Sequence, residues 1–319
     1  MVKQSKQRSG WPIKKTLEVL EISRSTYQRW IKPKVWENPP PRCSPGRMYK
    51  LLAGERRAII DYALKHPEIR HRELAWRMLD EDICATSAAT VYRVLGQEGL
   101  VCRWKPKTKT KGQGRGDKPT RPDEKWQTDI KYVQVGQRNC YLISFMDVYS
   151  RYIVHHRLLR CMDGQSVSTE AAAALAKLDS DCRPDIQSDH GSGFIARDFA
   201  ETLGEFGVTH KKIRPHTPTD NAEIERYHRT IADKLDEHDL SDFIKAQDTI
   251  DGIIEQYNHH RLHAALSYLR PVDYYRGDPE VLLAQRRRKL QQARELRKQE
   301  NLRLRQHMIP WPQESKTVA

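Results

Sequence analysis

The sequence predicts an α/β core, a mixed five-stranded sheet flanked by helices, preceded by all-α modules and followed by a basic helical tail. Three observations predict this class. The first hundred residues carry apolar side chains at helical spacing, the middle of the chain alternates strand-like and helix-like runs, and the end combines strong helix formers with many cations. At 319 residues the chain is long enough for two or three domains.

The composition favours a polyanionic partner. Fifty-six Lys and Arg against 42 Asp and Glu give a net charge of +14, although ribosomal and RNA-binding proteins share such a charge. Six cysteines without a CxxC pair fit buried thiols in a reducing cytosol. No apolar run approaches about 18 residues and no signal peptide is evident, so we expect no membrane span and a cytoplasmic, nucleoid-associated location.

Residues 1–32 predict a helix-turn-helix-like segment, with two short helices between residues 11 and 31. Its apolar positions are Ile13, Leu17 and Leu20, and either Ser23 or Ser25 can cap the second helix. The candidate DNA contacts on the second helix are Arg24, Gln28 and Arg29. The alternative is a helical pair that only packs on its neighbours. Residues 33–51 are rich in proline and predict an extended linker.

Residues 52–104 predict a second, three-helix module of the helix-turn-helix type, with Thr86 or Ser87 capping its last helix. Arg93 on that helix is a candidate DNA contact, although one arginine on a helix is more often simply solvated. Residues 105–122 have almost no apolar side chains and predict a basic linker that tracks phosphates or acts as a solvated hinge. Its candidate DNA contacts are Lys105, Lys107, Lys109 and Lys111.

Residues 123–276 predict the core. The expected strands cover residues 127–135, 139–148, 151–159, 185–189 and 208–213. The expected helices cover residues 164–178 and 196–206, and a third helix contains Glu225. Three strands in hairpin connection followed by alternating helix and strand describe a mixed sheet with helices on its faces.

Three carboxylates in this core are candidates for a metal site. Asp129 lies in the first strand, Asp189 ends the fourth beside a glycine-containing turn, and Glu225 follows 36 positions later. Two divalent ions about 3.5–4 Å apart need several hard, anionic oxygens. Glu223 has a structural role available as the capping-box partner of Asp220, which leaves Glu225 for chemistry. Spacing alone is unspecific, because the chain has 42 acidic residues.

Other polar residues of the core have competing interpretations. His190 and His228 can line the site, but ordinary packed or solvated histidines are more common. Asn221 can orient substrate or metal-bound water, or make a hydrogen bond at the start of a helix. Asp147 favours a turn or an ion pair with Arg151 over metal binding.

Four sequence motifs together resemble the catalytic core of DDE transposases and retroviral integrases, above all the integrase-like, second-reading-frame transposases of bacterial insertion sequences. The motifs are WQTDI, SDHGSGF, PTDNAEIER and YNHHRLHAALSYLRPVDYY, and the resemblance covers residues 11–276. It implies a ribonuclease-H-like fold in which the first and fourth strands are neighbours. It also implies that Asp129, Asp189 and Glu225 are the catalytic and metal-binding triad, holding two Mg²⁺ ions or Mn²⁺ as a substitute.

The resemblance further implies an enzyme that cuts the ends of a mobile element and joins their 3′-hydroxyls to other double-stranded DNA. Homo-oligomers on paired ends and an upstream-frame helix-turn-helix partner are implied as well. Many relatives carry Lys or Arg seven residues after the glutamate, where this chain has Ala232. Arg226, Arg229 and Lys234 are nearby cations that can substitute, and Arg226 and Arg229 are the candidate DNA contacts. The alternatives are a nuclease of the same fold without strand transfer and a domesticated, catalytically idle regulator.

Residues 277–319 predict a basic tail. Between residues 284 and 307, nine Lys or Arg accompany two Glu in a sequence of strong helix formers, which predicts a basic helix or a disordered arm. Such an arm would bind phosphates without sequence preference. A contact between subunits is the competing interpretation, although the leucine spacing is a poor heptad.

Overall fold

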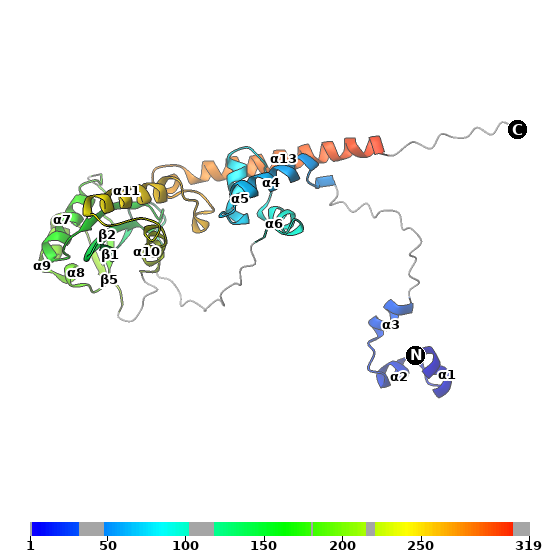
Figure 1. Ribbon diagram of the computed structural model, residues 1–319. Helices are drawn as coiled ribbons and strands as arrows, with labels where there is room; N and C mark the ends of the chain where they lie inside the picture. Colours follow the sequence, from blue (N-terminus) through cyan, green and yellow to red (C-terminus); the bar gives the residue numbers. More distant parts are fainter. Residues whose placement is uncertain (1, 32–47, 102–117, 180, 215–220, 309–319) are drawn as a thin grey trace. The chain divides into compact units, whose positions relative to one another are not determined.

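The computed structural model describes residues 2–31, 48–101, 118–179, 181–214 and 221–308 (Figure 1). The chain divides into two compact units, one formed by residues 1–50 with 298–319 and the other by residues 51–297. Across the described ranges, none of the helices combines the length and the apolar character that crossing a membrane requires.

The first unit contains three short helices. They are α1 (Val2–Ser9), α2 (Ile13–Val19) and α3 (Arg24–Ile31). A small core of Val2, Leu17 and Tyr27 holds them together. Ser23 is the capping residue of α3, because its Oγ accepts a hydrogen bond from the Thr26 amide at 3.2 Å. The two helices predicted between residues 11 and 31 are thereby confirmed, whereas α1 was not predicted.

The second unit begins with the predicted three-helix module. Its helices are α4 (Ala53–Lys65), α5 (His71–Asp80) and α6 (Ala88–Gln97). Ile59, Met78 and Val91 are fully buried between them. Ser87 caps α6, since its Oγ accepts from the Thr90 amide at 3.3 Å. The apolar spacing of the sequence thus predicted the three helices of this module, and Ser87 is one of the two residues predicted to cap the last of them.

The core of the second unit is a five-stranded mixed sheet. Its strands are β1 (Lys125–Val135), β2 (Arg138–Asp147), β3 (Ile153–Leu159), β4 (Asp185–Ser188) and β5 (His210–Lys212). The order is β3-β2-β1-β4-β5. The first three strands pair antiparallel, whereas β4 is parallel to both β1 and β5. This is the ribonuclease-H-like arrangement, and the predicted neighbourhood of the first and fourth strands is confirmed.

Helices cover both faces of the sheet (Figure 1). On one face lie α7 (Gly164–Leu175), α8 (Ser192–Ile195) and α9 (Arg197–Glu205), packed on side chains such as Trp126 and Phe145. On the other lie α10 (Ala222–Leu235) and α11 (Phe243–His259), packed on side chains such as Val133 and Leu142. Because side chains alternate along a strand, the odd-numbered residues of β1 face α10.

The chain continues through η3 (Ala264–Leu266) and α12 (Pro271–Tyr275) into the long helix α13 (Pro279–Met308). The tail is therefore a helix and not a disordered arm over this range. Asn258 of α11 braces the core, because its side chain makes two hydrogen bonds, of 2.9 and 3.0 Å, with the backbone of Ile153 in β3.

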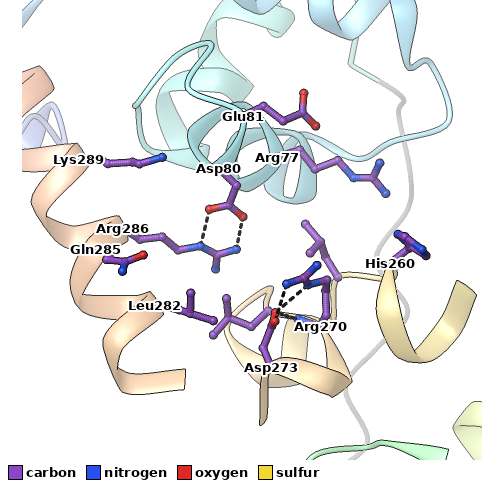
Figure 2. Close-up of a pocket in the computed structure, with 12 residues that line it drawn as sticks. Arg77, Asp80, Glu81, His260, Arg270, Asp273, Leu282, Gln285, Arg286 and Lys289 are labelled. Carbon is purple, nitrogen blue, oxygen red and sulfur yellow. Dashed lines mark hydrogen bonds and ion pairs between the residues drawn. The ribbon is translucent and has the colours of Figure 1, made fainter. Parts of the chain in front are cut away.

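Two arginines of α13 are buried in ion pairs with the three-helix module. Arg286 Nε donates to Asp80 at 2.8 Å, and its other nitrogens donate to the carbonyls of Ser267 and Tyr268 at 2.9 and 2.8 Å (Figure 2). Arg297 donates to Glu55 at 2.8 Å. The two arginines are 4% and 7% exposed. Neither interpretation of the tail anticipated these pairs, although exposed cations such as Arg287 and Arg288 remain for phosphate contact.

A cavity of about 390 Å³ lies beside Arg286 (Figure 2). Its cations are paired: Arg286 with Asp80, Arg270 with Asp273, Arg77 with Glu73 and Lys289 with Asp82. Because its charges neutralise one another and no candidate triad residue lines it, we assign this cavity a structural role.

We predict that Arg286→Ala lowers the free energy of unfolding by about 2 kcal/mol, because it leaves Asp80 and two carbonyls without their charged donor. Arg287→Ala, its exposed neighbour on the same helix, should change stability by less than about 0.5 kcal/mol. Urea unfolding of the two variants measures the difference. Equal effects of the two substitutions would contradict the assigned role of Arg286.

Candidate active site

Asp129 is placed by β1 on the sheet face that α10 covers. It is paired in register with Ser144 of β2. One carboxylate oxygen, Oδ2, lies 3.2 Å from Nδ1 of His228, and the other accepts a hydrogen bond from the Ile130 amide at 2.9 Å. The side chain keeps 22% of its surface exposed. Asp129 is thus held by a neighbour yet open on one side.

Glu225 lies in the first turn of α10, where its side chain is exposed. Partial burial and the negative charge of Asp129 raise the pKa of Glu225, while Arg229 and His228 act in the opposite direction. The two carboxylates are therefore near enough to repel each other. A divalent cation between them would remove that repulsion.

Asp189 directly follows β4. The parallel register pairs Gln127 of β1 with Gln187 of β4, and two further residues along each strand lead to Asp129 and Asp189. Adjacent strands lie about 4.8 Å apart, so the two aspartates occupy neighbouring positions at the carboxyl end of β4. Asp189 Oδ1 accepts a hydrogen bond from the Gly191 amide at 2.9 Å. A Cβ at Gly191 would meet that oxygen at 3.0 Å, which explains the glycine.

Within the described residues, no three His, Cys, Asp or Glu side chains are already arranged as a ligand group. The structure brings His228 against Asp129 and Glu225 within the electrostatic reach of Asp129, whereas Asp189 lies two residues beyond the last paired residues of β1 and β4, Gln127 and Gln187. The donors are nevertheless of the kind Mg²⁺ prefers, hard carboxylate oxygens, and the mutual repulsion of Asp129 and Glu225 favours a cation.

Asn221 stands at the N-cap of α10, where Asp220 was predicted; Asp220 itself lies outside the described residues. Asn221 is 3% exposed and its side chain makes no capping hydrogen bond, so the simple helix-start interpretation is wrong. Its Oδ1 has no hydrogen-bond partner among the described residues. A buried acceptor of this kind usually has a partner, which suits an oxygen that serves a ligand.

Glu223 has a structural role, and its predicted capping box involves Asp220, which lies outside the described residues. Its Oε2 accepts a hydrogen bond from Gln127 Nε2 at 3.2 Å, and its Oε1 lies 3.3 Å from Arg151 Nη2. Gln127 Oε1 in turn accepts from the Ile224 amide at 3.1 Å. The first turn of α10 is thereby fixed to β1, and Glu225 is left facing the site.

The remaining site candidates divide into two groups. His228 is buried, its Nδ1 lies 3.2 Å from Asp129 Oδ2, and its Nε2 lacks a partner in the described part of the chain. His190 is exposed, and its Nε2 contacts the carbonyl of Ile213 at 2.9 Å. Of these two, the described contacts place only His228 against a triad residue.

The candidate DNA contacts are scattered over the described surface. Arg24 and Gln28 are exposed on α3, and Arg226 and Arg229 are exposed on α10. Arg93 folds back on its own helix, donating to the Ala89 carbonyl and the Thr90 hydroxyl. The side chain of Arg29, and all of Lys105, Lys107, Lys109 and Lys111, lie outside the described residues. DNA contact by these side chains stays a prediction.

Asp147 is a turn residue, as favoured from the sequence. It is fully buried and accepts hydrogen bonds from the Asp123 and Ser150 amides at 3.0 and 2.7 Å. Burial raises the pKa of Asp147 to about 6. The Arg151 amide also donates to the Asp147 carbonyl at 2.8 Å, and the Arg151 guanidinium lies 3.3 Å from Glu223.

Comparison with known proteins identifies this core. Residues 119–218 and 206–271 each match the integrase core domain family. The chain is 27% identical over 277 residues to the transposase InsK of insertion sequence element IS150 of Escherichia coli (strain K12), covering 84% of this chain and 94% of the relative. It is 28% identical over 159 residues to the transposase of IS904 of Lactococcus lactis, covering 49% of this chain and 63% of the relative.

Solved structures give weaker similarities. A chain of the simian T-cell lymphotropic virus intasome in complex with PP2A regulatory subunit B56 gamma aligns with a TM-score of 0.46 and 14% identity, over 69% of this chain and 74% of that one. The HTLV-2 integrase catalytic core domain in complex with magnesium aligns with a TM-score of 0.41 and 16% identity, over 49% and 98%.

The sheet with α10 is accordingly an integrase core domain. Over 84% of its length the chain is similar to a transposase of an insertion sequence.

We predict that Asp129→Asn lowers the pKa of Glu225, because the nearby negative charge that raises it is removed. The pKa can be measured by NMR titration of the Glu225 side-chain carboxyl carbon. Asp233→Asn, which removes an exposed charge further along α10, is the matched control. An unchanged Glu225 pKa in Asp129→Asn would show that the two carboxylates do not interact.

We also predict a pH effect from Asp147. Its pKa lies at about 6 in the folded chain against an ordinary value of 3.8, so between these values the folded state binds more protons than the unfolded state. The free energy of unfolding therefore falls as pH rises from 4 to 6, by about 2 kcal/mol. Asp147→Asn should remove this fall. Urea unfolding at pH 4 and pH 7 tests it, and parallel pH dependences of the two proteins would contradict it.

Proposed function

We propose that this chain is a Mg²⁺-dependent polynucleotidyl transferase that cleaves DNA at the ends of a mobile element and joins the resulting 3′-hydroxyl ends to other DNA. The observation that carries the proposal is the closeness of Asp129 and Glu225, two mutually repelling carboxylates from β1 and α10, with Asp189 directly after β4, the strand paired with β1. All three lie within the residues that match the integrase core domain.

In this proposal Asp129, Asp189 and Glu225 hold two Mg²⁺ ions, for which Mn²⁺ can substitute. Bound there, the ions would activate water or a 3′-hydroxyl and stabilise the leaving oxygen of an in-line displacement. No covalent link between enzyme and DNA is required. The magnesium present in the HTLV-2 integrase core domain is consistent with this assignment.

The surrounding residues have supporting roles. His228 holds one oxygen of Asp129 and so orients the carboxylate, as outer-shell partners of metal ligands do. Asn221 offers its buried Oδ1 to a water molecule or to the substrate. The Gln127 side chain hydrogen-bonds to Glu223 and to the Ile224 amide. These bonds hold the first turn of α10, which carries Glu225, in place against β1.

The DNA and the assembly follow from the same proposal. The helical modules at residues 1–32 and 52–104 recognise the element ends, and exposed cations contact phosphates. Joining two ends in one event requires two active sites, which suits a homo-oligomer on paired ends. An upstream-frame helix-turn-helix protein is a further proposed partner. The intasome among the similar structures is an assembly of this general kind.

The triad is tested by Asp129→Asn, Asp189→Asn and Glu225→Gln. Each should lower cleavage and joining by more than about 100-fold, since even outer-shell partners of a metal site cost about 10- to 100-fold. Binding of the full-length protein to element-end DNA should remain. Cleavage and strand-transfer products are measured on labelled duplexes in Mg²⁺.

Asp233→Asn, a neutralised carboxylate on the same helix, should retain activity. Near-normal strand transfer by Glu225→Gln would overturn the triad. Cleaved but never joined products from the wild-type protein would favour a nuclease, and DNA binding without cleavage in Mg²⁺ would favour an idle regulator.

A further inference from the structure

Three titratable side chains form a row where α7 packs against β3. His155 of β3 lies between Glu170 of α7 and Lys177, which follows the end of that helix. Glu170 Oε2 lies 2.7 Å from His155 Nε2, and Lys177 Nζ lies 2.9 Å from His155 Nδ1. A carboxylate, an imidazole and an amine are therefore joined in series through both nitrogens of one ring.

The carboxylate determines which nitrogen of the ring carries the hydrogen. An ionised carboxylate only accepts hydrogen bonds, so a neutral His155 carries its hydrogen on Nε2 and donates it to Glu170. Nδ1 is then left with a lone pair that faces Lys177 Nζ. Burial lowers the pKa of His155 below its ordinary value, which favours this neutral form at neutral pH. His155 therefore presents a basic nitrogen to an amine.

The amine of Lys177 can be reached from solvent and is held only by neutral groups. The side chain is exposed, and its Nζ donates to the Val154 carbonyl at 3.3 Å in addition to its contact with His155. Partial burial lowers the pKa of Lys177, while the charge of Glu170 acts in the opposite direction. Carboxylates, by contrast, stabilise the charged form of other lysines of the chain, among them Lys211, Lys234 and Lys289.

We propose that Lys177 is a site of N-acylation by an acyl phosphate, with His155 as the base and Glu170 as the residue that positions it. The ammonium form of Lys177 passes one proton to His155 Nδ1, and the lone pair of the resulting amine attacks the acyl carbon. The C–N bond forms, the bond from this carbon to the phosphate oxygen breaks, and phosphate leaves with the electron pair. Of the two protons that the nitrogen loses, one leaves with the phosphate and the other passes from His155 to water.

Acylation would change the contact between α7 and β3. The acylated nitrogen is uncharged and keeps one N–H, so it can retain only one of its bonds to His155 and to the Val154 carbonyl. β3 is an edge strand of the sheet, and Val154 lies between Ile153 and His155, where the register with β2 shifts. The modification would therefore remove one side-chain contact at this edge and one positive charge from the surface.

The test follows the acetylation of the full-length protein by acetyl phosphate at neutral pH, with mass spectrometry of its peptides measuring the extent at each lysine over time. Lys65 is the reference within the same chain, because it is exposed in the last turn of α4. Lys177 should react at least about 10-fold faster than Lys65, since a positioned base contributes about 100-fold or more. Equal or slower reaction of Lys177 would overturn the proposal and leave the row as a structural contact.

Two variants assign the effect to the row. His155→Asn removes the base, and Glu170→Gln supplies an amide that can donate to Nε2 and so place the ring hydrogen on Nδ1. Each should bring the rate at Lys177 close to that at Lys65. Unchanged rates in both variants would overturn the proposal, because the accessibility of Lys177 alone would then explain its reaction.

The matched control is His156→Asn. His156 is the next residue of β3 and contacts a different carboxylate, Asp251, at 2.9 Å, so its substitution should leave the rate at Lys177 unchanged. A loss of rate equal to that of His155→Asn would contradict the assignment to His155. The comparison of Lys177 with Lys65 in the wild-type protein needs no variant, so it decides the proposal even where a substitution prevents folding.

Discussion

The candidate site depends on one buried side chain, Gln127. It lies in β1 with 1% of its surface exposed, donates to Glu223 and accepts from the Ile224 amide. A buried amide left without partners would cost about 1–3 kcal/mol, so these bonds hold α10 in one position over the sheet. The same residue is in register with Gln187, two positions before Asp189. The sheet pairing and the helix position that bring the carboxylates together thus share one residue.

The packing around Gln127 keeps this arrangement rigid. Tyr227, fully buried on α10, contacts the Ser144 hydroxyl through its own at 3.3 Å, and Ser144 is the strand partner of Asp129. Ile224 and Ile231 fill the space between α10 and the sheet. Two like charges at Asp129 and Glu225 can remain close because this apolar contact, and not their own interaction, determines where the backbone lies. A cation bound between the two carboxylates would relieve their repulsion.

Much of the fold could be predicted because its signals are local. Alternating and helical apolar spacing located the strands and α10, and glycine after Asp189 marked the turn. The partners of Glu223, Arg286 and Arg297 could not be predicted, because each bonds to a residue distant in the chain: Gln127 at 96 positions and Asp80 and Glu55 at more than 200. A run of nine cations indicates charge, but tertiary packing decides which of them are buried. The triad came from family motifs, since spacing alone was unspecific.

The distribution of arginines shows how a strongly basic chain divides its charge between structure and binding. Arg286 is enclosed by a carboxylate and two carbonyls, so its charge is spent within the fold and cannot reach a ligand. Arg226 and Arg229, by contrast, are exposed on α10, one and four residues after Glu225. Because an ion pair inside the fold compensates the charge of its cation, the exposed cations, and not the total of +14, are the ones that can still attract an anion to this core.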